Sequence, residues 1–191
     1  MKNKIFIDFD ETIVATNKAF CATYNSIFKD VEGFIHADYN QCNCWDYKDV
    51  CPLLENREDV ETVFRSVEFF KTLTMIDDNM ASVLQELITQ YEVIICTIGN
   101  PGNLALKSIW IQKHLPYISQ VILMSNSNCI MDKSNIQMED CIFIDDNINN
   151  LNSSNASKKI CYGKEYKWNK EWDGLRALDS KELLTMITEN K

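Results

Sequence analysis

The sequence predicts an α/β fold in which a Rossmann-like parallel sheet carries helices on both faces, with a small helical cap inserted after the first strand. Two observations predict it. Short apolar runs typical of buried strands alternate with segments of helical periodicity along most of the chain. This alternation is interrupted once, soon after the first apolar run. The 191 residues suffice for one domain with a full core and a small inserted subdomain.

Five apolar runs predict the strands, and each is short and bounded by polar residues. The first run, Ile5-Phe6-Ile7, is typical of a buried strand and ends at Asp8. The other four runs comprise residues 93–96, 121–124, 141–144 and, with a weaker pattern, 159–162. Because helical patterns separate most of these runs, we expect the strands to be parallel.

Three segments in the second half of the chain predict helices. Residues 79–91 and 103–114 repeat apolar side chains at the spacing of one helical face, the second after a Pro101-Gly102 start. Ser180 is predicted to cap a last helix, whose apolar side chains recur at the same spacing.

The interruption predicts the cap. Between residues 16 and 75 we find no convincing central strand, whereas residues 17–28 and 56–70 have helical patterns. An irregular segment rich in Cys, Trp, Tyr and Asp joins them. We therefore expect an α/β core of residues 1–15 and 76–191, with residues 16–75 forming a cap over the carboxyl end of the first strand.

Charge and hydropathy exclude several classes of function. The formal net charge is −9 and the isoelectric point is about 4.7, which disfavours a nucleic acid polymer as partner because duplex binding needs a basic face. No stretch approaches the roughly 18 apolar residues of a membrane span. The chain enters its first strand almost at once, without a signal-peptide hydrophobic region, so we expect a cytoplasmic protein and no membrane partner.

The cysteines agree with a cytoplasmic location. Of the eight, Cys42, Cys44 and Cys51 lie close together in the sequence, with His36 nearby. Their spacing matches no standard zinc knuckle, in which C-x₂-C pairs are expected. Four others, within or beside apolar runs, look like reduced core residues: Cys96, Cys129, Cys141 and Cys161. We expect free thiols rather than a disulfide framework or structural zinc.

Polar side chains of one chemical kind follow the predicted strands. Because the carboxyl ends of parallel strands meet at one edge of a sheet, we expect these residues to converge. Taken singly, each has a structural interpretation: a helix cap, a surface lysine or an acidic turn. The set comprises Asp8 and Asp10 after the first strand, Thr97-Ile98-Gly99 after the second, Lys133 after the third, and Asp145-Asp146 after the fourth.

This ordered set resembles the haloacid dehalogenase superfamily of phosphatases. The matching motifs are Asp8-x-Asp10-x-Thr12, the threonine that follows an apolar strand, Lys133 and the Asp145-Asp146 pair. In detail the chain looks most like the 5′(3′)-deoxyribonucleotidases and their bacterial and phage relatives. The supporting segments are Trp45-Asp46, Glu68-Phe69-Phe70, Asp132-Lys133-Ser134-x-Ile136 and Tyr166-x-Trp168-Asn169.

The resemblance implies a role for each motif. Asp8 would attack phosphorus and form an aspartyl-phosphate, while Asp10 would act as general acid and base. Thr12 would fix the turn. Mg²⁺ would be held by the Asp8 side chain, the Asp10 carbonyl, Asp146 and, directly or through water, Asp145. The phosphoryl oxygens would be bound by Thr97, by the amides of Ile98 and Gly99, and by Lys133.

Two departures from the family pattern concern the substrate site. Glu11 stands where many members have Gly, and Thr97-Ile98-Gly99 replaces the usual Thr-Ser-Pro, so one phosphate-binding hydroxyl is missing. Recognition of a base would fall to flat aromatic side chains of the cap, although each of them could equally be core. The candidates are Trp45, Tyr47, Phe69 and Phe70, while Trp168 and Trp172 could close the rim or pack the C-terminal segment.

The predicted function is that of a Mg²⁺-dependent phosphomonoesterase that hydrolyses (deoxy)nucleoside 5′-monophosphates through an aspartyl-phosphate. Two alternatives stay open: a phosphatase for another small phosphoester such as a sugar phosphate, and a catalytically weakened relative that binds nucleotide. The expected partner is a small nucleoside monophosphate, and the sequence leaves the number of subunits open, a homodimer included.

Overall fold

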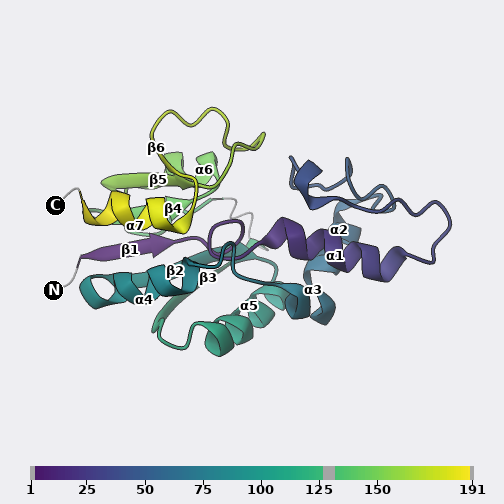
Figure 1. Cartoon of the computed structure of the whole chain (residues 1–191), viewed down its shortest axis with the longest axis horizontal. Coiled ribbons are helices and arrows are strands. Elements are labelled where there is room, and N and C mark those ends of the chain that lie inside the picture. The colour runs from purple at the N-terminus through teal and green to yellow at the C-terminus, as the bar shows by residue number, and fades with distance from the viewer. Residues whose placement is uncertain (1–2, 127–131, 190–191) are drawn as a thin grey trace.

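A computed structural model describes residues 3–126 and 132–189 and contains one sheet of six parallel strands (Figure 1). The strand order is β3-β2-β1-β4-β5-β6. Five strands coincide with the predicted apolar runs, and the short β6 was not predicted because three residues make no apolar run. The strands are β1 (Lys4–Ile7), β2 (Glu92–Gly99), β3 (Gln120–Ser125), β4 (Ile142–Asp145), β5 (Lys158–Tyr162) and β6 (Leu175–Ala177).

Helices cover both faces of the sheet, as the sequence predicts. Alternate strand residues enter two separate apolar clusters, because successive side chains of a strand point to opposite faces. Ile5 and Ile7 pack on the side of α4 (Met80–Gln90), α5 (Pro101–His114) and α7 (Ser180–Thr188). Phe6 packs on the other side, with Leu151 of α6 (Ile148–Ser153). None of the described helices has the length and apolar character of a membrane span.

The register of the central strands aligns the ends that carry the polar motifs. Ile7, the last residue of β1, is paired with Ile95 of β2 and Ile144 of β4. Asp8 and Asp145 therefore follow directly after paired residues at the same edge of the sheet. The convergence expected from the sequence is thus a consequence of strand order and register.

The segment of residues 16–75, called the cap below, lies beyond the carboxyl ends of the strands (Figure 1). The chain leaves and re-enters the core through adjacent segments, since Ala15 N donates to Thr74 O at 3.0 Å and Ile76 N to Ile13 O at 2.9 Å. The cap contains α1 (Thr16–Phe28), the short 3₁₀ helix η1 (Tyr39–Gln41), α2 (Arg57–Phe64) and α3 (Val67–Thr72).

The helical pattern predicted over residues 56–70 is two helices rather than one. The chain breaks after Arg65, where Ser66 adopts an extended conformation and its Oγ accepts a hydrogen bond from Phe69 N at 3.1 Å. A serine side chain that caps a helix competes with continuation of the preceding one, so the apolar stripe survives while the helix is interrupted.

The described cysteines are free thiols, as expected, and Cys129 lies outside the described residues. The Sγ atoms of Cys21 and Cys42 are 3.4 Å apart in the core of the cap. His36 contacts the amide of Asn25 instead of a cysteine. No group of cysteine and histidine side chains in the described residues is close enough to bind a metal.

Asp77 joins the amino-terminal ends of α4 and α7. Its carboxylate accepts hydrogen bonds from Asn79 N at 2.9 Å, from Ser180 N at 3.0 Å and from Tyr162 Oη at 2.9 Å. Ser180 was predicted to cap α7, but its hydroxyl bonds Asp77, and the cap is the preceding Asp179. Burial alone would raise the pKa of Asp77, yet these donors lower it below its ordinary value.

Replacing Asp77 is expected to destabilise the fold. Asp77→Ala removes several hydrogen bonds to a charged acceptor, so the free energy of unfolding should fall by about 1–2 kcal/mol after solvent screening is allowed for. Because the folded pKa is lowered, the contribution is present above the unfolded value of about 4 and is lost as the pH falls through the folded value. Urea unfolding of wild type and variant at pH 7 and pH 3 measures the difference. The control is Asp78→Ala, which changes an exposed side chain. An equal loss of unfolding free energy in Asp77→Ala at both pH values would contradict the role given to the Asp77 carboxylate.

Candidate active site

The acidic turn after β1 has an unusual backbone. Asp8 N donates to Ile144 O at 2.9 Å and so extends the sheet by one residue. Glu11 adopts the left-handed conformation with φ 51°, which costs least for glycine and explains why a glycine suits this position. The Glu11 carboxylate compensates by accepting from Asn17 N at 2.7 Å and Tyr166 Oη at 2.8 Å.

Thr12 follows in the same turn and is fully buried. Its hydroxyl has no hydrogen-bond partner within residues 3–126 and 132–189. Within the described residues, the structure therefore shows no hydrogen bond through which the Thr12 hydroxyl would fix the turn.

Lys133 is buried among the carboxylates at the ends of β1 and β4. Its Nζ donates to Asp8 Oδ1 at 2.5 Å and to Asp145 Oδ2 at 2.6 Å. Burial lowers the pKa of Lys133, but the charges of Asp145 and Asp8 outweigh burial and raise it above its ordinary value. Lys133 is therefore a permanent cation that neutralises part of the acidic cluster.

The remaining negative charge raises the pKa of two other carboxyl groups. Burial raises the pKa of Asp8 to about 7, with Lys133 opposing the shift and Asp145 and Asp10 adding to it. Burial also raises the pKa of Asp146 well above its ordinary value, and the charges of Asp145 and Asp8 raise it further. A cation between these groups would favour their ionised forms, because opposite charge lowers a carboxyl pKa.

Asp8, Asp145 and Asp146 can together hold a metal ion. One oxygen from each lies within 4.8 Å of the others, and all three residues are buried. Asp145 is saturated with donors, since Lys133, Asn147 N and Asn150 Nδ2 all bond its carboxylate. Asp8 Oδ2 and Asp146 Oδ1 receive no hydrogen bond from the described residues. Such carboxylate oxygens are the ligands of hard divalent cations, so the donor set fits one.

Asp10 belongs to a second group of polar side chains. Thr16 Oγ1, from the first turn of the cap helix α1, donates to Asp10 Oδ1 at 2.9 Å. Lys107 Nζ, from α5, bonds Asp10 Oδ2 and also donates to Thr97 Oγ1 at 2.8 Å. Both carboxylate oxygens of Asp10 are thus held, one from the cap and one from the core.

The carboxyl end of β2 lies beside Asp10, because the strand continues through Thr97-Ile98-Gly99 and does not end before Thr97 as expected from the sequence. Thr97 is fully buried and its hydroxyl contacts Lys107 and Asp10, whereas Ile98 and Gly99 line the cleft. A Cβ at Gly99 would stand 2.6 Å from Asn103 Oδ1, so only glycine fits here without displacing that side chain. Ile98 provides its backbone but no hydroxyl, as the sequence indicates.

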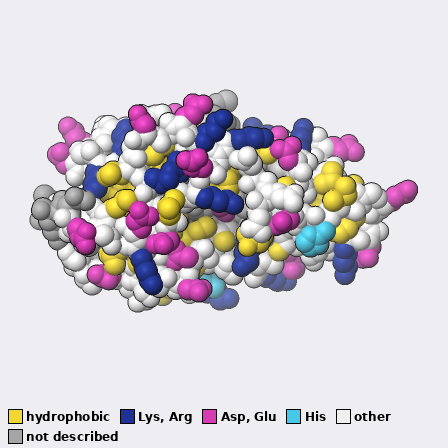
Figure 2. Space-filling model, turned by 45° about the horizontal axis from the view of Figure 1, so that its top comes forward, with side chains coloured by type: hydrophobic (Ala, Val, Ile, Leu, Met, Phe, Trp, Pro, Cys, Tyr) yellow, Lys and Arg dark blue, Asp and Glu magenta, His cyan; other side chains and the backbone are white. Residues whose placement is uncertain are grey.

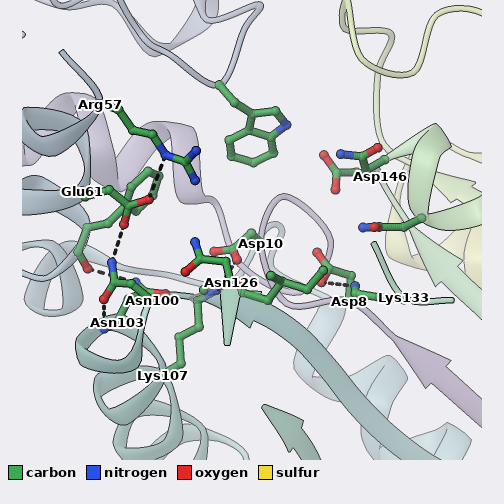
Figure 3. A pocket seen from close by; sticks show the side chains of 16 residues that line it. Asp8, Asp10, Arg57, Glu61, Asn100, Asn103, Lys107, Asn126, Lys133 and Asp146 are labelled. Atoms are coloured by element: carbon green, nitrogen blue, oxygen red, sulfur yellow. Dashed lines mark hydrogen bonds and ion pairs between the residues drawn. The ribbon is translucent and has the colours of Figure 1, made fainter. Parts of the chain in front are cut away.

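These groups face a cleft of about 250 Å³ between core and cap (Figure 3). Figure 3 shows Asp8, Asp146 and Lys133 on one side, Arg57, Glu61 and Asn100 on the other, and Asp10 between them. Asn100 Nδ2 bonds Glu61 Oε2, and Asn103 Nδ2 donates to Phe64 O at 2.9 Å, so the amino end of α5 is joined to α2 of the cap.

The four cap aromatic residues named from the sequence differ in their positions. Trp45 lines the cleft. Tyr47 and Phe69 are fully buried, and Tyr47 stacks on Phe20 with ring centroids 3.7 Å apart. Phe70 packs against Phe69 at 5.1 Å, away from the residues that line the cleft. Of the four rings, Trp45 is the one that lines the cleft, whereas Tyr47 and Phe69 lie in the buried core and the partly buried Phe70 packs against it.

Lys107 and Phe64 are the main site residues that the sequence interpretation missed. Lys107 lies on the buried face of α5, three residues after Leu104 and four before Ile111, and is 2% exposed. A lysine at apolar helix spacing was the available signal, since such a charge must find a partner. Phe64 lines the cleft, whereas its apolar spacing within residues 56–70 indicates only a buried helical face.

Solved structures share this fold at low sequence identity. A predicted phosphatase from Clostridium acetobutylicum superposes with a TM-score of 0.70 at 14% identity, over 99% of each chain. A magnesium-bound HAD-hydrolase from Bacillus subtilis gives 0.64 at 13% identity, over 98% of this chain and 99% of that chain. A HAD family hydrolase from Deinococcus radiodurans with bound phosphate and sodium superposes with a TM-score of 0.60 at 14% identity, over 98% of this chain and 96% of that chain.

The fold, with its ordered acids, threonine and lysine, defines a phosphatase of the haloacid dehalogenase superfamily. Residues 2–191 match the family described as 5′ nucleotidase, deoxy (pyrimidine), cytosolic type C protein, and the chain belongs to that family. No curated protein matches the chain at a significant level.

Removing the Lys107 amine is expected to impair catalysis. Lys107→Met deletes the donor shared by Asp10 and Thr97, so the rate of phosphate release should fall by about 10²-fold, the typical loss for one preorganised donor. Steady-state phosphate release measures it, with circular dichroism to check folding. The matched control is Lys113→Met, an exposed lysine on the same helix, and full activity of Lys107→Met would refute the assignment.

Proposed function

We propose that the protein is a Mg²⁺-dependent phosphomonoesterase that hydrolyses nucleoside 5′-monophosphates, deoxynucleotides included, through an aspartyl-phosphate. One observation carries the proposal. Lys133 donates to Asp8 Oδ1, while the other oxygen of Asp8 receives no hydrogen bond from the described residues. Asp8 lines the same cleft as Asp10, Asp146 and Lys107. Membership of the nucleotidase family supports the substrate class.

Asp8 is the nucleophile in this proposal. One oxygen of its carboxylate forms a bond to phosphorus as the bond from phosphorus to the ester oxygen breaks, and Asp10 gives a proton to the leaving oxygen. Asp10 then takes a proton from the water that attacks phosphorus, which frees Asp8 and phosphate. Thr16 and Lys107 keep the Asp10 carboxylate in place for both transfers.

Phosphate binding combines a cation with backbone donors. The amides of Ile98 and Gly99 and the Lys133 amine are proposed to bind the phosphoryl oxygens, in keeping with the residues that line the cleft. Mg²⁺ would be held by Asp8, Asp146 and the Asp10 carbonyl, with Asp145 adjacent to these ligands. The ion would offset the charge of the phosphoryl group and the carboxylates.

Selection of the substrate is assigned to the cap. Trp45 and Phe64 provide aromatic walls of the cleft, and a flat aromatic face suits stacking on a base. A second candidate follows from the polar wall. Arg57, Glu61 and Asn100 match the hydroxyl groups of a sugar phosphate as readily as the edge of a base.

The proposal keeps a small molecule as partner and a cytoplasmic location. On the face drawn in Figure 2, basic and acidic side chains are interspersed, in keeping with a net charge of −9 and not with a nucleic acid polymer as partner. The free thiols of the described cysteines agree with a reducing compartment.

Asp8→Asn tests the chemistry. An amide cannot form the aspartyl-phosphate, so phosphate release from dUMP or dTMP should fall below detection while the fold is retained. A malachite green assay in Mg²⁺ measures the product, and circular dichroism checks the fold. Asp173→Asn, an exposed acid elsewhere, should keep full activity. Turnover by Asp8→Asn would eliminate Asp8 as nucleophile.

A substrate panel tests the specificity. Phosphate release from deoxynucleoside and ribonucleoside monophosphates should exceed release from sugar phosphates, and it should be lost in EDTA and restored by Mg²⁺. Trp45→Leu should reduce the preference for nucleotides by about tenfold, because one stacking contact contributes about 1–1.5 kcal/mol. Equal rates on sugar phosphates would favour the second candidate, and nucleotide binding without turnover would favour a weakened relative.

A further inference from the structure

Trp168 contacts the carboxylate of Asp146, although it is not among the residues that line the cleft. Its Nε1 donates to Asp146 Oδ2 at 2.7 Å. The next residue, Asn169, is fully buried and its Nδ2 donates to the Asp146 carbonyl at 3.0 Å. These bonds hold both the side chain and the backbone of Asp146, and they leave Oδ1 as the oxygen available to a cation.

The Trp168 ring also touches the cap. It stacks on Tyr166 with centroids 4.1 Å apart and planes at 7°. Trp45, which lines the cleft from the cap, packs against the same indole at 4.7 Å and 35°. The orientation of the indole, and with it the hydrogen bond to Asp146, therefore depends on where the cap loop lies.

Neighbouring residues strengthen this connection. Lys167 N donates to Asn43 Oδ1 of the cap loop at 2.7 Å. Tyr166 Oη donates to Glu11 in the acidic turn at 2.8 Å. The segment of residues 166–169 thus contacts the cap loop, the acidic turn and Asp146 at once.

We propose that Trp168 is a positioning residue that couples the cap, through Trp45, to Asp146 and so to the affinity of the site for Mg²⁺. The proposal rests on the Mg²⁺ site of the proposed function. An indole N–H on one carboxylate oxygen orients the other toward the cation, and such outer contacts commonly change metal affinity by 10–100-fold. Coupling of this kind is reciprocal. Binding of Mg²⁺ therefore favours the cap position in which Trp45 packs on Trp168 by the same factor by which that position favours binding of Mg²⁺.

The first experiment measures Mg²⁺ binding without substrate. Calorimetric titration, together with the rise in melting temperature with Mg²⁺, gives the dissociation constant for each variant. Trp168→Phe keeps an aromatic ring but loses the donor, and its dissociation constant should rise about tenfold or more. Trp172→Phe is the matched control, because it also loses one indole hydrogen bond, to Leu175 O, away from Asp146. Unchanged affinity in Trp168→Phe would overturn the proposal.

The second experiment tests the coupling to the cap. Trp45→Leu leaves the Trp168 donor present but removes the ring packed on it, so Mg²⁺ affinity should fall about fivefold. Combined with Trp168→Phe, it should cause no further loss, since both changes break one connection. Fully additive losses would overturn the coupling. Trp45→Leu also keeps the proposal testable should Trp168→Phe fail to fold.

The two levels of the proposal fail in different ways. If the unmodified protein binds no Mg²⁺, the proposed metal site and the coupling are both overturned. If it binds Mg²⁺ and Trp168→Phe binds equally well, only the role of Trp168 is overturned and the proposed function stands.

Discussion

Burial of Lys133 between Asp8 and Asp145 is the interaction on which the rest of the site depends. Parallel strands β1 and β4 are adjacent and in register, so their carboxyl ends bring acids together whether or not the charges agree. A buried amine satisfies one oxygen of each acid, while Asn147 and Asn150 bond the other oxygen of Asp145. Without that positive charge, desolvation and mutual repulsion would raise the pKa of Asp8, the proposed nucleophile, further and favour its protonated form.

The second half of the site is assembled from both the core and the cap. Asp10 is held by Thr16 at the start of the first cap helix and by Lys107 in the core. Core and cap also meet where Asn100, before α5 of the core, donates to Glu61 of the cap helix α2. A cleft built in this way places Asp10, the proposed general acid, between core and cap, so the position of the cap would bear on the proposed chemistry as well as on substrate choice.

Much of the fold and the acidic centre could be predicted because their signals are local. Apolar runs identified five strands, and the residue after each run identified Asp8, Thr97 and the Asp145-Asp146 pair. The three residues of β6 carry no such signal, and pairing with β5 alone makes them a strand. The break at Ser66 was missed because the apolar stripe continues across it and a serine cap is a one-residue event.

The sequence by itself determined the sheet and the order of motifs, because these follow from periodicity and from strand ends. The tertiary structure alone decided which side chains share a cleft. Trp45 faces it while Tyr47 and Phe69 are core, and aromatic composition cannot distinguish those positions. Lys107 reaches Asp10 from nearly a hundred residues away, a pairing that only the packing of α5 against the sheet creates.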